Sequence, residues 1–321
     1  MSQTVQSLSY FGKTPQAADF VVHHQDRESG VAFQNWLIDG MAIARERLGD
    51  RWEALYEALP SLRFVYWKGS PDELLVGSLV TSKDESGRRF PLSGFWEINY
   101  EHVESCRWNL PVHYDGLFRE VTSRLHPHRE ADHNLSLKTE VETWPAPDSL
   151  SNPENSSIGN LKVGDIDAAF GQPWVERASI NLLELSFRVR RWAGWVPDFG
   201  LRFPLPPEGP LYLPTLHFWL QLTRITMGEG TGVPNLLWTE ARSVPGFIDV
   251  YYATPSPVAA LFLVAPDLEG DSVYPVHEED SPRVHLDTNE GRAVIGQVQD
   301  KDTSLEEVLR LVSTHSPRSS A

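Results

Sequence analysis

The stretch "FQNWLIDGMAIARERLGDRWEALYEALPSLRFVYW", residues 33–67, changes from the spacing of a helix to that of a strand. Its first part repeats apolar residues at the spacing of an amphipathic helix, which ends at Gly49. These residues are Phe33, Leu37, Met41, Ala44 and Leu48. A second helix ends at Pro60, and residues 62–67 are short and β-rich. The stretch therefore predicts two helices that lead into a strand.

Strands and helices keep alternating through the rest of the chain. Further strands are predicted at residues 74–80, after the charged turn 83–92, and at residues 235–241 and 247–254. Further helices are predicted at residues 117–125, 174–192, 258–264 and 304–312. Residues 215–225 could form a buried helix or a strand, and their length favours the helix. Because helices alternate with short strands, the pattern predicts a mixed α/β sandwich with helices on the faces of a sheet.

Two segments differ in composition from the rest. Residues 126–172 are rich in proline, serine, asparagine and charge, which predicts an irregular polar insertion. Residues 266–321 are predicted to be an acidic tail, loop-like over 266–303 and ending in a short helix. We therefore expect one α/β domain over residues 1–265. We also expect one contiguous core within it, with the helices of Trp36 and Trp174 packed on the sheet.

The charge balance limits the classes of partner. The 321 residues carry 28 lysines and arginines against 44 aspartates and glutamates, a net charge of −16. Such an acidic chain is a poor ligand for nucleic acid or for an anionic membrane surface. The first residues have no cationic and apolar leader, no apolar run is long enough to cross a bilayer, and Cys106 is the single cysteine. We expect a cytoplasmic protein without a signal peptide or membrane insertion.

Gly12-Lys13-Thr14 is the second half of a phosphate-binding loop motif. That motif needs a glycine at the position of Ser7 and a helix directly after it, where this chain has Pro15. The phosphate-loop interpretation therefore fails, and we expect a short strand over residues 8–11 that turns at Gly12.

Catalytic and metal-binding patterns are scarce. His126, His128 and His133 are close enough in sequence to share a metal ion, but they lie in a polar stretch that contains Pro127. We expect a solvated loop there, with a metal site as the alternative. Since no serine, cysteine or histidine pattern of a known catalytic type occurs, we expect no catalytic residues, no metal and no cofactor.

Arg88 and Arg89 follow one another in a charged turn, "RRFP". Two arginines in a turn can bind a carboxylate or a phosphate of a partner. The alternative is that they are solvated or paired with local carboxylates such as Asp84 and Glu85.

Three ordered segments resemble the TagF (ImpM) family of type VI secretion accessory proteins. They are "YFGKTPQAADFV" (10–21), the stretch 33–67 quoted above and "SKDESGRRFPL" (82–92). The positions that match the family pattern are Gly12, Lys13, Pro15, Asp19 and Phe20, then Trp36, Leu37 and Gly40, then Arg63 and Phe64, and finally Asp84, Gly87, Arg88, Phe90, Pro91 and Leu92. Ala18 takes the place of a family glycine.

The resemblance implies a three-layer α/β/α sandwich with a mixed central sheet and no enzymatic activity. It implies a cytoplasmic, post-translational negative regulator of type VI secretion that acts by binding protein, in some members a forkhead-associated scaffold protein. The alternatives are a structural component of the secretion assembly and a nucleotide- or phosphate-binding enzyme that uses Lys13 and Arg88.

The segments that carry the resemblance also suggest a protein-binding surface. We expect Gly12, Lys13, Pro15, Asp19, Phe20, Arg88, Arg89 and Phe90 to contribute to it. A cationic patch on a chain of net charge −16 could select an acidic or phosphorylated segment of a partner. The competing interpretation is that Arg88 pairs with Asp19 or Asp84 and only braces the turn.

Overall fold

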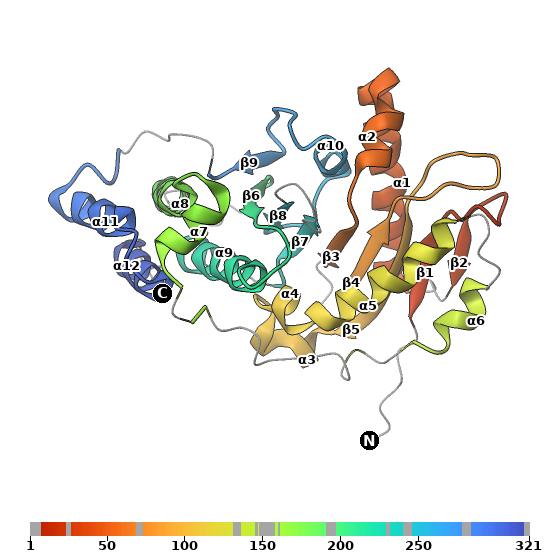
Figure 1. Ribbon diagram of the computed structural model, residues 1–321, viewed down its shortest axis with the longest axis horizontal. Helices are drawn as coiled ribbons and strands as arrows, with labels where there is room; N and C mark the ends of the chain where they lie inside the picture. The colour runs from red at the N-terminus through yellow and green to blue at the C-terminus, as the bar shows by residue number, and fades with distance from the viewer. Residues whose placement is uncertain are drawn as a thin grey trace.

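The computed structural model of the chain is a layered α/β structure (Figure 1). It describes residues 8–23, 27–68, 73–130, 136–144, 147, 158–159, 161–190, 197–228, 232–239, 246–277 and 284–317. Within these ranges, none of the helices combines the length and the apolar character that crossing a membrane requires.

A nine-stranded sheet forms the centre, in the order β2-β1-β5-β4-β3-β7-β8-β6-β9. The strands are β1 (Ser9–Gly12), β2 (Val21–His23), β3 (Leu62–Tyr66), β4 (Glu73–Val80), β5 (Leu92–Asn99), β6 (Gly200–Leu205), β7 (Asn235–Thr239), β8 (Gly246–Tyr251) and β9 (Val273–Pro275). All neighbours are antiparallel except β6 and β9, so the sheet is mixed, as the resemblance implies. The pairing of β3 with β7 joins the first half of the chain to the second.

Three helices cover one face of the sheet: α1 (Glu28–Leu48), α2 (Trp52–Ala58) and α10 (Ala259–Val264). Helix α1 buries Phe33, Trp36 and Leu37 against this face. It approaches α10 so closely that a Cβ atom on Gly40 would lie 2.6 Å from the Cβ atom of Ala260. Glycine at position 40 therefore allows α1 and α10 to pack side by side.

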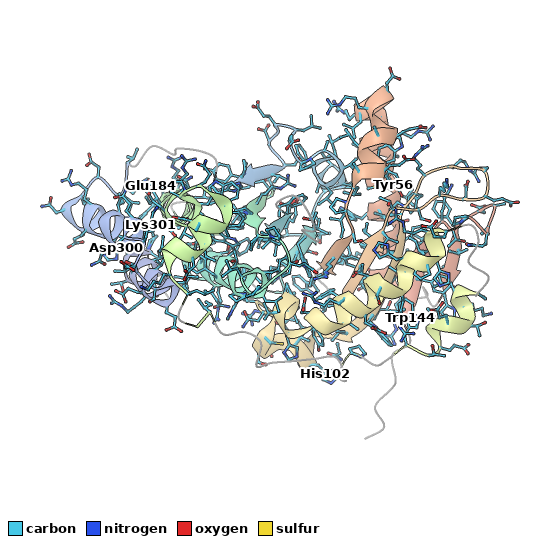
Figure 2. The ribbon with its side chains drawn as sticks, viewed as in Figure 1. Tyr56, His102, Trp144, Glu184, Asp300 and Lys301 are labelled. Carbon is cyan, nitrogen blue, oxygen red and sulfur yellow. The ribbon has the colours of Figure 1, made fainter. Side chains whose placement is uncertain are left out.

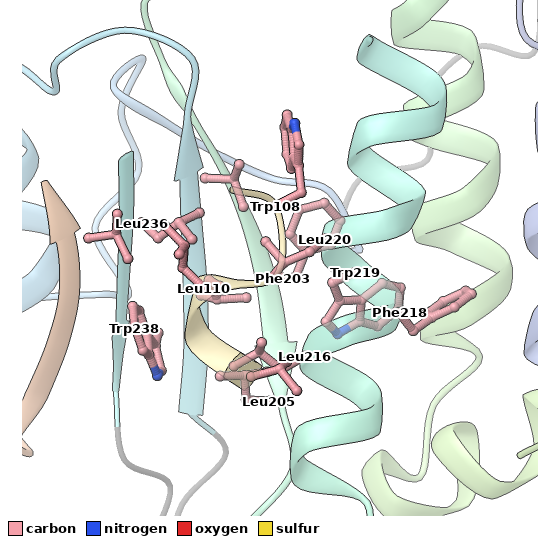
Figure 3. Close-up of a cluster of buried hydrophobic side chains, with 14 of the residues drawn as sticks. Trp108, Leu110, Phe203, Leu205, Leu216, Phe218, Trp219, Leu220, Leu236 and Trp238 are labelled. Atoms are coloured by element: carbon pink, nitrogen blue, oxygen red, sulfur yellow. The ribbon is translucent and has the colours of Figure 1, made fainter. Parts of the chain in front are cut away.

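The opposite face carries α5 (Asp115–Leu125) over β4 and β5 and α9 (Tyr212–Met227) over β6. Figure 3 shows Trp219 and Leu216 of α9 packed beside Phe203 and Leu205 of β6. Three short helices lie elsewhere along the first half of the chain: α3 (Tyr100–Val103), α4 (Leu110–His113) and α6 (Leu137–Val141). Turns of 3-10 helix occur at Glu104–Cys106 and His126–Arg129, and a third, at Gly49–Arg51, joins α1 to α2. The three-layer arrangement thus confirms the expected fold class.

Outside α9 lie α7 (Val163–Phe170), α8 (Trp174–Arg190), α11 (Asn289–Gln299) and α12 (Leu305–His315). Figure 1 shows α11 and α12 at the end of the molecule opposite β1 and β2. In Figure 2, Glu184 lies on α8, where its buried carboxylate accepts hydrogen bonds from the backbone N–H groups of His285 and Leu286, both at 2.8 Å. This contact fixes the segment before α11 to α8.

Four expectations from the sequence were wrong. The buried side chains form two clusters, one on each sheet face, instead of one contiguous core. Helix α8, which begins at Trp174, packs mainly on α7, α9 and α11 instead of on the sheet. The segment 266–303 is not all loop, because it contains β9 and α11, and the insertion at 126–172 contains α6 and α7. Trp192 of the expected helix lies outside the described residues.

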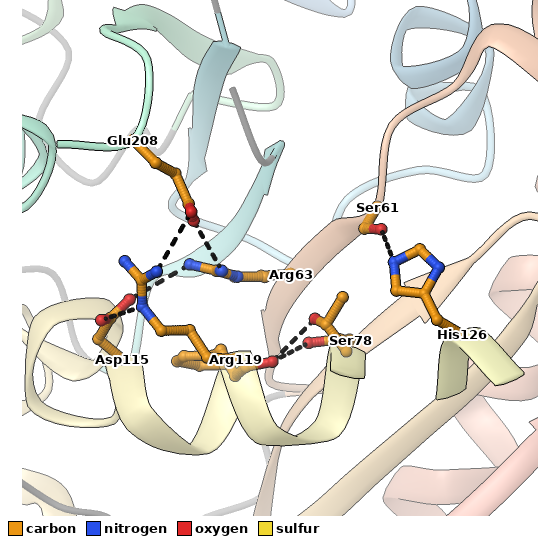
Figure 4. Close-up of polar contacts among 9 residues, drawn as sticks. Ser61, Arg63, Ser78, Asp115, Arg119, His126 and Glu208 are labelled. Carbon is orange, nitrogen blue, oxygen red and sulfur yellow. Dashed lines mark hydrogen bonds and ion pairs between the residues drawn. The ribbon is translucent and has the colours of Figure 1, made fainter. Parts of the chain in front are cut away.

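An ion-pair network connects the two halves of the chain near the β3–β7 junction (Figure 4). Arg63 of β3 is 1% exposed, and its guanidinium lies 3.2 Å from carboxylate oxygens of both Asp115 and Glu208. Arg119 contacts the same two carboxylates, at 2.6 Å and 3.2 Å. Arg63, which matches the family pattern, therefore ties α5 to the chain before α9.

Glu97 of β5 is a buried carboxylate whose protonation should couple to folding. Its Oε2 atom lies 3.1 Å from Nε of Arg27, whose Nη1 atom also contacts Glu73 at 2.7 Å. Within the described part of the chain, its Oε1 atom has no hydrogen-bond partner. Burial raises the pKa of Glu97 to about 7; Arg27 opposes the shift and Glu73 adds to it.

Because the folded state holds a proton that the unfolded state releases, Glu97 contributes stability below its ordinary pKa and loses it as the pH rises through about 7. Glu97→Gln, which resembles the protonated form, should therefore gain roughly 1–3 kcal/mol relative to the natural protein between pH 4 and pH 8. Urea unfolding at several pH values measures this gain. A difference between the two proteins that does not vary with pH would contradict the prediction.

Candidate functional site

The turn that follows β1 is fixed by a close contact between two chain segments. Gly12 has φ 148°, and a Cβ atom there would lie 2.2 Å from the carbonyl oxygen of Pro91. The backbone N–H of Ala17 then donates to the carbonyl of Thr14 at 3.1 Å. Gly12 is still the last residue of β1 and pairs with Val21, and the hydrogen-bonded turn spans residues 14–17, so the expected turn at Gly12 was placed too early. Lys13 lies between the strand and this turn, beside the charged turn of residues 83–92.

Asp84 is the point where the two turns meet. Its side chain is fully enclosed, and its Oδ2 atom lies 2.7 Å from both Nζ of Lys13 and Nε of Arg88. Its Oδ1 atom accepts hydrogen bonds from the backbone N–H and hydroxyl of Ser86 and from the backbone N–H of Arg88. Arg88 also donates to the carbonyl of Ala18 at 2.7 Å. The pairing of Arg88 with Asp84, which the bracing interpretation expects, is therefore present.

The other suggested partner of Arg88 does not contact it. The carboxylate of Asp19 accepts a hydrogen bond from the backbone N–H of Phe20 at 2.8 Å, a local contact within the turn. Glu85, the second local carboxylate considered, contributes its backbone N–H to the carbonyl of Ala17 at 3.0 Å.

The ionisation state of Asp84 determines whether the ammonium group of Lys13 is available to bind a ligand. Burial alone would raise the pKa of Asp84, but hydrogen bonds from Lys13, Ser86 and Arg88 outweigh it and hold the pKa well below its usual range. The carboxylate is therefore ionised and neutralises Lys13, whose ammonium also lies 5.0 Å from the ring centre of Phe20. Because Lys13 is 6% exposed and already paired, it is poorly placed to bind a nucleotide phosphate.

Side chains of α2 contact Arg89 and Ser82, which lie at the two ends of the charged turn. Arg89 contacts Glu53 at 2.9 Å and Glu57 at 2.7 Å. The hydroxyl of Tyr56, labelled in Figure 2, donates to the carbonyl of Ser82 at 3.0 Å and accepts from its N–H at 2.9 Å. Burial raises the pKa of Tyr56, so the phenol stays neutral and can make both bonds.

A groove of about 390 Å³ lies between this turn and helices α1 and α2. Five of the eight expected binding residues line it, namely Lys13, Phe20, Arg88, Arg89 and Phe90. Gly12, Pro15 and Asp19 do not line it, and they shape the turn instead. The ring of Phe20 is 38% exposed, stacks on Phe11 at 5.1 Å and meets Phe90 edge-on at 4.9 Å.

The helical wall of the groove was not expected from the sequence. The wall consists of Ile38, Met41, Ala42, Arg45, Trp52 and Glu53. Ile38, Ala42 and Arg45 recur at the spacing of one helix face, beside the buried stripe that contains Met41. That spacing could have indicated a second, half-exposed face on α1.

A larger cavity of about 870 Å³ lies at the other edge of the sheet, beside β9 and the end of α10. Its walls include Arg202 and Phe262 together with the exposed carboxylates of Asp198, Asp267 and Glu269. None of the eight expected binding residues lines it, so the groove at α1 is the candidate functional site.

The histidines of the polar insertion have separate partners. His126 contacts Ser61 at 3.1 Å (Figure 4), and His128 contacts Glu140 at 2.8 Å. His133 lies outside the described residues. Across the described ranges, no group of three or more histidine, cysteine, aspartate or glutamate side chains is arranged to hold a metal ion.

The hydrogen bond between Ser61 and His126 runs in the wrong direction for His126 to activate Ser61 as a nucleophile. Arg129 donates to Nδ1 of His126 at 3.3 Å, so that nitrogen carries no proton. The Nε2 atom of a neutral His126 is then the protonated one and donates to Ser61, whereas a general base must accept the serine proton.

Replacement of Asp84 tests the bracing role. Asp84→Asn should lower the melting temperature at about pH 7, because Lys13 and Arg88 would lose the carboxylate they share. The pKa of Asp84 is lower in the folded state than in the unfolded state. Its ionised carboxylate therefore stabilises the fold above the ordinary pKa of aspartate, and this stabilisation is lost as the pH falls below about 4. Asp19→Asn is the control and should have little effect. An equal loss for Asp84→Asn at about pH 3 and about pH 7 would contradict this account.

Comparison with known proteins places the groove within a recognised domain. Residues 9–142 match the model of the TagF N-terminal domain, described as type VI secretion system-associated. A search of solved structures finds PA0076 from Pseudomonas aeruginosa PAO1, which is 18% identical, with a TM-score of 0.49 over 84% of this chain and 99% of that chain. No curated protein matches the chain. Residues 9–142, which supply every wall of the groove, therefore carry the match to the type VI secretion system-associated TagF N-terminal domain.

Proposed function

We propose that this protein is a non-enzymatic, cytoplasmic accessory protein that negatively regulates a type VI secretion system by binding one of its proteins. The observation that carries the proposal is the convergence of Lys13, Phe20 and the Arg88–Phe90 turn on one groove within the TagF N-terminal domain. These residues come from two segments about 70 positions apart, and Lys13 of the first segment and Arg88 of the second share one buried carboxylate, Asp84. A rigid frame of this kind supports a binding surface.

The partner that the family resemblance suggests is a forkhead-associated scaffold protein of the secretion machinery. Binding would act post-translationally, because an occupied scaffold could not recruit its other partners. The state of Lys13 disfavours the nucleotide-binding alternative, since its ammonium is enclosed and paired with Asp84.

Two measurements in the native host test the proposal. Affinity purification of the full chain with quantitative mass spectrometry should recover a type VI protein, and overproduction of the chain should lower secretion of type VI substrates without changing the amounts of the machinery proteins. A structural component would be recovered too, but its overproduction would not repress secretion. Recovery of no type VI protein would contradict the proposal.

A further inference from the structure

We propose that the groove between α1, α2 and the 86–90 turn binds a protein segment that carries one large apolar side chain flanked by carboxylates. This inference rests on the proposed function, and it specifies the chemistry of the partner. No part of it depends on which protein of the secretion machinery supplies the segment.

The floor of the groove is apolar and adaptable. Its lining includes the apolar side chains of Phe20, Ile38, Met41, Trp52 and Phe90. At about 390 Å³ it is at the small end of the range of about 300–1,000 Å³ for ligand sites, enough for one large side chain and parts of its neighbours. The exposed ring of Phe20 and the unbranched side chain of Met41 can pack around such an anchor.

Two arginines at the rim of the groove, Arg45 and Arg88, have guanidinium N–H groups that can bind a partner. Arg45 is exposed, and among the described residues it forms no ion pair. Arg88 is 61% exposed and uses two of its five N–H groups, one on Asp84 and one on the carbonyl of Ala18. Its three other N–H groups therefore remain available to a carboxylate of a partner.

The charge count near the groove contrasts with that of the chain. Of the charged residues that line the groove, Lys13, Arg45, Arg88 and Arg89 are positive and Glu53 is negative. The whole chain carries −16. The cationic lining therefore favours an acidic segment at this groove, in contrast to the negative charge of the chain as a whole.

Carboxylates fit this arrangement better than a phosphate group does. A phosphate dianion needs several cations to converge on one point, and Lys13 would be the natural central one. The ammonium group of Lys13 already forms an ion pair with Asp84, and the Lys13 side chain is 8% exposed. The remaining cations, Arg45 and Arg88, come from different walls of the groove and suit separate carboxylates on either side of an anchor.

A peptide display library selected on the full chain tests this inference. Peptides retained by the natural protein should be enriched in aspartate and glutamate beside a leucine or an aromatic residue. Measured by fluorescence anisotropy, their affinity should fall about tenfold or more with Arg45→Glu, since this reverses a rim charge. Arg47→Glu is the matched control on α1, because Arg47 is exposed but outside the groove, and it should leave the affinity unchanged.

Several outcomes would overturn the inference: selection of no peptides, selected peptides without acidic enrichment, equal effects of Arg45→Glu and Arg47→Glu, or tighter binding when a phosphoserine replaces the acidic residues. These results are independent of the proposed function. If Arg45→Glu and the natural protein recover the same type VI protein equally from the native host, the inference fails and the proposed function stands. If no type VI protein is recovered, the proposed function fails whatever the peptides show.

Discussion

Trp36→Ala is expected to lower the free energy of unfolding by about 3–5 kcal/mol, the usual cost of truncating a buried tryptophan. Trp36 is 4% exposed on the sheet-facing side of α1, and its ring centre lies 5.9 Å from that of Phe33 and 6.0 Å from that of Tyr66. Its indole N–H also donates to the carbonyl of Ser256 at 3.1 Å. The side chain therefore joins α1 both to the sheet and to the segment before α10.

Urea unfolding of the full chain measures this loss. Trp36→Phe is the matched control: it keeps an aromatic ring in the core but removes the hydrogen bond to Ser256, so it should cost less than the alanine variant. An unfolding midpoint unchanged by Trp36→Ala would show that α1 does not pack as described. The wall of the groove formed by α1 would then be in doubt as well.

Asp249→Ala is the second change with a large expected effect, also about 3–5 kcal/mol, because it leaves the charge of Arg202 buried without its counter-ion. Arg202 and Asp249 are opposite one another on β6 and β8 and form two hydrogen bonds, at 2.7 Å and 2.8 Å. The carboxylate has no exposed surface. Arg202 also donates to the carbonyls of Phe262 and Pro266, so the pair holds the end of α10 on the sheet.

The double variant Arg202→Leu, Asp249→Leu distinguishes an uncompensated charge from a general loss of packing. Without any buried charge it should recover much of the stability that Asp249→Ala loses, as apolar replacements of buried pairs often do. Thermal unfolding of the three proteins at one pH provides the comparison. Equal destabilisation in the single and double variants would contradict the argument.

Helices were easier to predict from the sequence than the order of the strands. The run at residues 215–225 was long and apolar enough to indicate a buried helix, and α9 confirms it. The helix expected at residues 304–312 is α12, and the hydroxyl of Ser304 caps it by accepting a hydrogen bond from the N–H of Glu307 at 3.1 Å. The pairing of β3 with β7 joins residues far apart in the chain, and no local pattern specifies such a partner.

Helix α11 was missed for a related reason. Its sequence contains two glycines and only a few apolar residues, with Val294, Ile295 and Val298 among the buried ones. Such a segment has little intrinsic helix stability and gains most of it from packing on α8 and from the cap that Thr288 provides at Gly291. Neither the packing surface nor the tertiary contact is visible in the local sequence. The division of the chain at residue 265 stays a prediction.

The candidate site was predicted in part. The resemblance singled out Lys13, Phe20 and Arg88 in separate motifs, but nothing in the spacing showed that they meet at Asp84. Asp19 and Asp84 were equally plausible partners for Arg88, and only the fold of the 83–92 turn decides between them. The contribution of α1 was missed because Met41 was assigned wholly to the core, whereas it also faces the groove.

The central claim is that the groove is the surface that binds the secretion machinery. The most direct test compares Phe20→Ser with Val258→Ser in affinity purifications from the native host, with type VI proteins quantified by mass spectrometry. The two side chains are almost equally exposed, 38% and 37%, but only Phe20 lines the groove. Both variants should melt close to the natural protein. The account predicts that Phe20→Ser loses most of the type VI partner while Val258→Ser keeps it, and equal recovery by the two folded variants would contradict it.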